Sequence, residues 1–236
     1  MPSYVNSLVI QFSAELKPYE VPAFRGAVIN AIGDKADILF HNHKEEGLRY
    51  AYPLIQYKRI GGKASIVCIN AGTEAIGQFF SNMKLELNIG DHITPIQVCS
   101  IRPHQTLVQV WDNAFCYHLR NWLPLNEENY RQYTEQTSLT ERVSLLERIL
   151  IGNILSFAKG VGVDIARQIR CSIMDIEGTR LIKVKGNRLM SFDVMFKTNV
   201  SLPDFIGLGK HTSFGHGIVC QCRDKEGKQN DTTIQQ

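Results

Sequence analysis

The chain contains 236 residues, of which 44% are hydrophobic and 21% are charged. These proportions are ordinary for a folded protein, and the length allows one large domain or two small ones. The sequence has no apolar run long enough for a membrane-spanning helix. Its first twelve residues lack the basic start and apolar block of a signal peptide. We therefore expect a cytoplasmic protein that is not associated with a membrane.

The net charge of +3 is too small to indicate nucleic-acid binding by itself. The segment from Lys159 to Lys197 is more basic, with eight basic residues against four acidic ones. Such a stripe fits a surface that follows a phosphate backbone, and it equally fits a solvated sheet face. Charge alone therefore leaves both interpretations open.

The six cysteines are scattered, and no two of them form a CxxC pair. Cys220 and Cys222 stand two residues apart without a matching second pair. Zinc sites use paired ligands at fixed spacing. We therefore expect no metal site, and we expect no other cofactor.

Apolar periodicity predicts the first elements of the chain. Alternation over 5–12 indicates a strand, and the pattern over 21–32 indicates a helix whose apolar residues share one face. Pro22 suits the start of this helix and Gly33 suits its end. A short strand is expected over 38–43.

The Gly-Gly pair at 61–62 indicates a tight hairpin between strands expected over 50–60 and 63–70. A second helix over 73–84 and further strand over 85–101 follow. The resulting order is strand, helix, strand, strand, helix, strand. This order is that of a ferredoxin-like domain.

The second half repeats the order less completely. Strands are expected over 114–123, 163–174, 181–184, 189–198 and 218–222. A polar helix or linker over 126–136 precedes a long helix that ends near residue 158. Ser138 and Glu141 form a capping-box pattern at the start of the long helix. The second helix of this half is missing or reduced.

These elements predict an α+β protein built from two tandem ferredoxin-like domains, the second of them degenerate. The first domain is expected over 1–108 and the second over 109–223. The polar stretch over 224–236 has no apolar periodicity, and we expect a flexible tail there.

A glycine-rich segment, Gly207 to Gly217, contains four glycines, one lysine, two histidines and two hydroxyl side chains. Glycine permits positive φ and close approach, so that backbone N–H groups can face phosphate oxygens. Thr212 breaks the GxGxxG dinucleotide fingerprint, and His211 breaks the Walker A pattern. From these residues alone, an ordinary glycine-rich turn remains the alternative.

The segment follows a strand that reads FDVMFKTNVSLP over 192–203. Together they resemble the C-terminal motif of CRISPR-associated endoribonucleases of the repeat-associated (RAMP) superfamily. The matching residues are Phe192, Val194, Phe196, Lys197, Leu202, Pro203, Gly207, Gly209, Lys210, Gly215 and Gly217. The first half resembles the same family at FRG over 24–26 and at YPLIQYK over 52–58, so the resemblance covers about residues 1–222.

The resemblance implies an enzyme that cuts precursor CRISPR RNA within its repeats without a metal. In such a reaction the 2′-hydroxyl of the RNA attacks the adjacent phosphate, while a base and an acid move the two protons. The products carry a 2′,3′-cyclic phosphate and a 5′-hydroxyl. A non-catalytic RNA-binding subunit of a CRISPR effector complex is the main alternative, and a metabolic enzyme of the same fold is a third. Effector-complex subunits and a second copy of the chain are further candidate partners.

Histidine suits the acid and base roles because its pKa lies near neutrality. If residues 38–43 are extended, His41 and His43 point to one face and can bracket one phosphate. One branch of the family is similar to this chain in carrying two histidines here and a tyrosine shortly after. That similarity implies His41 and His43 as base and acid, in either order, with Tyr50, or else Tyr52, as the third group. Surface histidines at a strand end are the alternative.

Contacts with the RNA are expected from the glycine-rich segment and from basic residues elsewhere in the chain. The expected contact residues are Lys44, Lys183, Lys185, Arg188, Gly207, Gly209, Lys210, His211, Ser213, Gly215 and Gly217. His211 and His216 form a second histidine pair, for which RNA contact is the expected role. Tyr57 and Phe214 are candidates either for stacking on bases or for the core.

Overall fold

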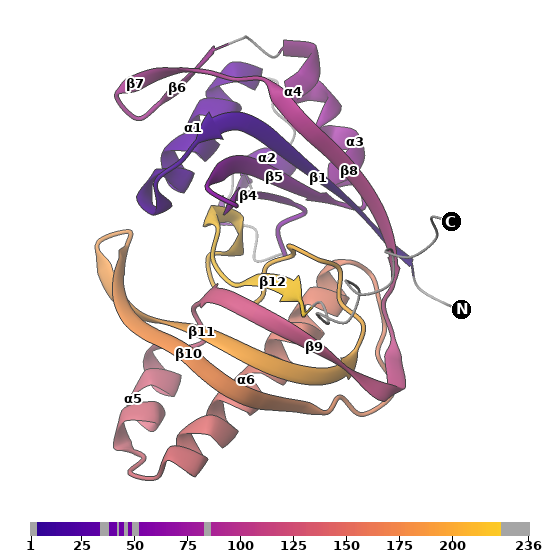
Figure 1. Ribbon diagram of the computed structural model, residues 1–236, viewed down its shortest axis with the longest axis vertical. Helices are drawn as coiled ribbons and strands as arrows, with labels where there is room; N and C mark the ends of the chain where they lie inside the picture. Colours follow the sequence, from indigo (N-terminus) through magenta and orange to yellow (C-terminus); the bar gives the residue numbers. More distant parts are fainter. Residues whose placement is uncertain are drawn as a thin grey trace, which may run out of the picture.

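The structure, a computed structural model, describes residues 4–33, 38–41, 43–44, 47–48, 52–82 and 86–222. Two four-stranded antiparallel sheets lie one above the other in Figure 1, and helices flank each of them. The chain leaves the first sheet at Leu107 and enters the second at Val110. No helix within the described ranges is long and apolar enough to cross a membrane.

The first half of the chain supplies one four-stranded sheet with the strand order β4-β5-β1-β8. Its elements are β1 (Tyr4–Glu15), η1 (Pro18–Glu20), α1 (Val21–Ile32), α2 (Ile38–His41), β2 (His43–Lys44), β3 (Gly47–Leu48), β4 (Ile55–Ile60), β5 (Lys63–Ile69), α3 (Gly72–Ala75), α4 (Gly77–Asn82), β6 (Glu86–Ile89), β7 (His92–Pro95) and β8 (Val98–Leu107). The pairs β2–β3 and β6–β7 form two small separate sheets.

The second half supplies the other sheet, with the strand order β10-β11-β9-β12. Its elements are β9 (Val110–Trp122), α5 (Glu127–Glu135), α6 (Leu139–Gly160), β10 (Cys171–Val184), β11 (Asn187–Val200), η2 (Thr212–Phe214) and β12 (Ile218–Gln221). When the main strands are numbered within each half, both sheets have the ferredoxin-like order, with the first strand between the third and the fourth. The predicted tandem fold is confirmed, and the glycine-rich segment stands where the second copy lacks a helix.

Three predicted elements were wrong. Residues 38–41 form the helix α2 instead of a strand, because a run of three apolar residues does not distinguish the two periods. The helix expected over 73–84 is interrupted at Ile76 and forms the two short helices α3 and α4. Residues 163–170 form no strand, because Val163 and Ile169 are buried in the core without strand partners, and β10 begins only at Cys171.

The starts of α5 and α6 bear on two further expectations from the sequence. Ser138 is the N-cap residue of α6, but its side chain makes no capping hydrogen bond, so the capping box does not form. The polar segment over 126–136 is a helix and not a linker. Asn126 caps it, because the Asn126 side chain accepts a hydrogen bond from the backbone N–H of Asn129 at 2.7 Å.

Buried apolar side chains form two clusters. One includes Phe12, Phe24 and Tyr57, and it lies between the first sheet and α1. The other spans both halves of the chain, since Val9 of β1 and Val219 of β12 belong to it. The halves therefore share a buried apolar interface, and such burial provides most of the favourable free energy of folding.

The edge strand β4 presents its two faces to different surroundings. Ile55 and Tyr57 belong to the cluster beneath α1, and strand alternation turns Gln56 and Lys58 the other way. All four residues are buried. A Cβ on Gly207 would stand 3.0 Å from Oε1 of Gln56, so this polar face of β4 lies against the glycine-rich segment.

Candidate functional site

The base of the glycine-rich segment is fixed by backbone hydrogen bonds. The N–H of Leu208 donates to the carbonyl of Gly217 at 2.8 Å, and the N–H of Gly217 donates to that of Asn121 at 2.9 Å. Gly217 has a φ of +65°, and a Cβ there would overlap the carbonyl oxygen of Leu208. Only glycine fits this position, because the backbone at Gly217 passes close to the backbone at Leu208.

The tip of the segment, residues 210–216, contains η2 and contacts two other parts of the molecule. The guanidinium carbon of Arg25, on α1, lies 4.9 Å from the centre of the Phe214 ring. The Nζ atom of Lys185, at the turn of the β10–β11 hairpin, lies 5.0 Å from the same centre. Figure 1 shows the end of this hairpin curling upward toward the first half of the chain. Phe214 thus makes cation–π contacts with side chains from two elements that are far apart in the sequence.

Arg25 also reaches the segment that carries the predicted catalytic histidines. Its Nη2 atom donates to the backbone carbonyl of Phe40 at 3.3 Å, and Phe40 precedes His41 in α2. The backbone of α2 and the tip of the glycine-rich segment therefore meet at one arginine. Elements about 170 residues apart in sequence are brought together in this way.

The predicted geometry of the histidine pair was wrong in one respect. His41 ends the helix α2 and His43 begins the strand β2, so the two residues do not share one extended strand. The side chains of His41, His43 and Lys44 lie outside the described part of the structure, as does the whole of Tyr50.

Tyr52 and Tyr57, the other two tyrosines considered for the site, both have roles in packing. The hydroxyl of Tyr52 donates to the carbonyl of Gly207 at 2.8 Å, and its ring packs edge-on against Phe157. Burial raises the pKa of Tyr52, so its hydroxyl stays protonated and holds the glycine-rich segment to the first half. Tyr57 is fully buried against Phe24, so it belongs to the core and does not stack on bases.

The tip of the glycine-rich segment is basic, and its histidines are neutral at pH 7. Burial lowers the pKa of His211, and Lys185 and Lys210 lower it further. Burial also lowers the pKa of His216 to about 4, with smaller contributions from His211 and Lys58. The neutral imidazoles can therefore donate and accept hydrogen bonds beside the lysines.

The predicted hairpin contacts Lys183, Lys185 and Arg188 are all exposed. Lys183 and Arg188 are directly opposite each other in the register of β10 and β11. Of the three, only Lys185 is brought against the glycine-rich segment, through Phe214. The hairpin end is thus a charged surface that continues from the tip.

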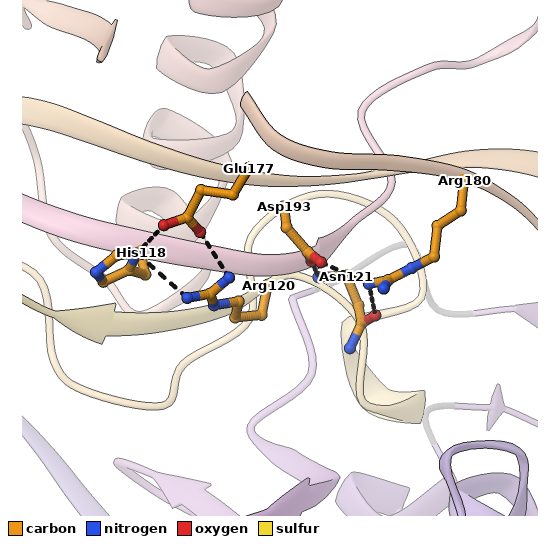
Figure 2. Close-up of polar contacts among 6 residues, drawn as sticks. All are labelled: His118, Arg120, Asn121, Glu177, Arg180 and Asp193. Atoms are coloured by element: carbon orange, nitrogen blue, oxygen red, sulfur yellow. Dashed lines mark hydrogen bonds and ion pairs between the residues drawn. The ribbon is translucent and has the colours of Figure 1, made fainter. Parts of the chain in front are cut away.

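Elsewhere in the stripe, Arg167 and Arg180 pair with carboxylates, and the stripe's own Glu177 pairs with two basic side chains of β9. Glu177 bonds His118 at 3.0 Å and Arg120 at 2.6 Å, as Figure 2 shows. Asp193 accepts from Arg180 at 2.7 Å in the same view. The solvated-sheet interpretation therefore holds for this part of the stripe.

Asn121 connects this network to the glycine-rich segment. Its N–H donates to Asp193 at 2.6 Å, and its side-chain oxygen accepts from Arg180 at 2.8 Å (Figure 2). Its carbonyl accepts from Gly217, so β9, β10 and β11 together fix the base of the segment. Among the described residues, no group of three or more histidine, cysteine or acidic side chains is arranged to hold a metal ion.

Sequence reasoning did not identify Arg25 or Lys58 as parts of this region. Arg25 is the only charged residue in α1, which is a detectable signal because the remainder of the helix is almost entirely apolar. Lys58 lies within a strand whose neighbours are buried, which is a weaker signal. Their proximity to the glycine-rich segment depends on tertiary structure.

Comparison with known proteins gives a consistent family assignment. The model of the Cas6b N-terminal domain matches residues 3–106, and the model of the Cas6b C-terminal domain matches residues 109–222. An uncharacterized protein of Methanocaldococcus jannaschii is 33% identical over 103 residues, which are 44% of this chain and 69% of that protein.

Two solved structures share the fold over nearly the whole chain. A crystal structure of Cas6b superposes with a TM-score of 0.84 and 24% identity, covering 93% of this chain and 100% of that one. A crystal structure of the CRISPR RNA processing endoribonuclease Cas6b superposes with a TM-score of 0.72 and 21% identity, with the same coverage. On the two family models, which together account for most of its length, the chain belongs to the Cas6b family.

Proposed function

We propose that this protein cuts precursor CRISPR RNA within its repeats, without a metal, by attack of the RNA 2′-hydroxyl. The observation that carries the proposal is the position of Arg25, which contacts both the carbonyl of Phe40 and the ring of Phe214. An RNA strand that follows the glycine-rich segment would pass directly beside α2, where His41 lies. One solved relative with the same fold is described as a CRISPR RNA processing endoribonuclease.

In this proposal the chemistry belongs to the first half of the chain. His41 and His43 take the 2′-hydroxyl proton and protonate the leaving 5′-oxygen, in either order. Tyr50 is the third group, and it donates a hydrogen bond to the phosphate. Tyr52 is not chosen, because its hydroxyl is buried and already donates to Gly207.

Binding in this proposal belongs to both halves. The tip of the glycine-rich segment offers Lys210 and the neutral His211, while the hairpin offers Lys183, Lys185 and Arg188. Arg25 adds a guanidinium that is held in place by its contact with Phe214. Together these groups form a cationic surface on which phosphates can be positioned, and such contacts make affinity salt-dependent.

The test is an incubation of the protein with repeat RNA in the presence of EDTA. We expect one cut per repeat, with a 2′,3′-cyclic phosphate and a 5′-hydroxyl at the new ends. A protein that binds the RNA tightly and leaves it intact would instead be a non-catalytic subunit of an effector complex. We further propose a cytoplasmic site of action. Association with effector subunits or a second copy is tested by size-exclusion chromatography with and without RNA.

A further inference from the structure

Lys58 is a buried amine at the interface of the two halves, and no carboxylate among the described residues pairs with it. The residue is 0% exposed, and its Nζ atom has no hydrogen-bond partner among the described residues. It lies on the face of β4 that is turned toward the second half. A fully buried lysine is rare unless it is paired, because removing an ammonium from water costs several kcal/mol.

The groups near Lys58 come from three other parts of the chain. Lys58 lowers the pKa of His216 in the glycine-rich segment, Cys220 of β12 raises the pKa of Lys58, and Ser65 is its register partner on β5. No carboxylate of a described residue acts on the amine. Burial lowers the pKa of Lys58 to about 7, so the amine is partly neutral near physiological pH.

Two more buried polar atoms at the interface of the two halves lack partners within the described chain. They are Nδ1 of His216 and Oε1 of Gln56. Gln56 shares the inward face of β4 with Lys58, and its Oε1 lies against Gly207. Buried polar atoms are normally hydrogen-bonded, so the unpaired atoms of Lys58 and His216, which interact electrostatically, indicate a site whose partner is a separate molecule.

The cover over this site is held to the rest of the molecule by side-chain contacts, in which Arg25 and Lys185 lie over the ring of Phe214. Residues 211–216 of the tip make internal hydrogen bonds, from Phe214 to His211 at 2.9 Å and from Gly215 to Thr212 at 3.4 Å. No hydrogen bond between described residues joins this tip to β4. The base of the segment, by contrast, is held by Leu208 and Gly217. Displacing the tip from β4 therefore breaks the contact between Arg25 and Phe214, while the base keeps its backbone hydrogen bonds.

We propose that Lys58 and His216 form a phosphate-binding subsite beneath residues 211–216, which a backbone phosphate of the bound RNA enters when the tip moves off β4. This inference rests on the proposed function, because it takes the RNA as the ligand. The phosphate supplies the counter-charge that Lys58 lacks, and His216 adds a hydrogen bond at a low local dielectric. Lys58 is then a substrate-binding residue whose charge gains a partner when RNA binds.

The test compares Lys58→Met with Lys63→Met, which removes the same charge from a partly exposed position on the neighbouring strand β5. Binding is measured with a 2′-O-methyl repeat RNA, which lacks the nucleophile and stays intact. We expect Lys58→Met to weaken binding about tenfold or more, as for loss of a hydrogen bond to a charged group. Lys63→Met should weaken it only slightly.

Two further measurements separate binding from folding. Methionine fits the length of lysine without its charge, so Lys58→Met should unfold at a higher temperature than the wild type. Phosphate binding also raises the proton affinity of the amine. Calorimetry in buffers of different ionisation enthalpy should therefore show proton uptake when wild-type protein binds RNA at pH 7.5, and less uptake for Lys58→Met.

The outcomes distinguish this subsite from the proposed function. Equal affinity and equal proton uptake for the two variants, with tight wild-type binding, would overturn the subsite and leave the proposed function intact. A Lys58→Met protein that is less stable than wild type would also overturn it, because the amine would then have a partner in the free protein. If wild type does not bind the RNA, the proposed function fails. In that case inorganic phosphate is added to both proteins and their unfolding temperatures are measured. A rise for wild type but not for Lys58→Met would assign the site to free phosphate.

Discussion

Arg25 and Phe214 lie 4.9 Å apart, measured from the guanidinium carbon to the ring centre, and they join the first helix to the glycine-rich segment. The same guanidinium donates to the carbonyl of Phe40. One side chain thus fixes the distance between the binding segment and the backbone beside His41.

Replacing Arg25 with Ala should slow cleavage of repeat RNA at least about tenfold, because it removes a charged hydrogen bond and a cation–π contact. Arg25→Lys should recover only part of the rate, since lysine lacks the planar group that reaches both partners. Single-turnover rates measure the effect. The matched control is Arg131→Ala on the exposed helix α5, and an equal loss in that variant would contradict the role of Arg25.

Replacing Gly217 with Ala should destabilise the fold by about 3 kcal/mol or more, since the new Cβ overlaps a backbone carbonyl at positive φ. Gly90 is a matched control, because it has a φ of +63° but open space around its Cβ position. Gly90→Ala should cost only about 1 kcal/mol. Urea unfolding gives both values. Equal costs would show that the close backbone approach at Leu208 does not require glycine.

Replacing Tyr52 with Phe should lower the free energy of unfolding by about 1 kcal/mol, because the carbonyl of Gly207 loses its hydrogen bond. Cleavage should fall only a few-fold. Tyr50→Phe should instead leave stability unchanged and reduce the cleavage rate strongly. The exposed Tyr19→Phe serves as the control for both. A large rate loss for Tyr52→Phe alone would reverse the assignment of the two tyrosines.

Stability should fall as the pH drops below about 6.5. The folded pKa of His216 is about 4, which lies below the unfolded value near 6.5, so the unfolded chain binds the proton more readily. The contribution is present above pH 6.5 and is lost toward pH 4. Urea unfolding of wild type and His216→Gln across this range measures it. Parallel pH profiles for the two proteins would contradict the buried neutral state of His216.

Much of the fold could be predicted from local patterns. The helix α1 occupies the predicted residues because its apolar period, Pro22 and Gly33 agree with one another. The Gly61–Gly62 turn likewise placed the β4–β5 hairpin, although β4 begins five residues later than expected. Where a segment was short, as in α2, the pattern held too few residues to separate helix from strand.

The site was only partly predictable. The glycine-rich segment was selected through its resemblance to a family motif, since its composition alone also fitted an ordinary turn, and its contact with RNA stays a prediction. Arg25 and Lys58 appeared only as letters of the family motifs and received no role, because their importance comes from contacts with segments about 160 to 190 residues away. The extended geometry assumed for His41 and His43 failed, since it depended on a strand that is replaced by α2 and β2.

The most direct test of the central claim is the cleavage of repeat RNA in EDTA by wild type and by the double variant His41→Ala/His43→Ala. His92→Ala, at an exposed strand position in the same half, is the control. The account predicts cyclic-phosphate ends with wild type and His92→Ala, and intact but bound RNA with the double variant. Full cleavage by the double variant would contradict the assignment of catalysis to His41 and His43.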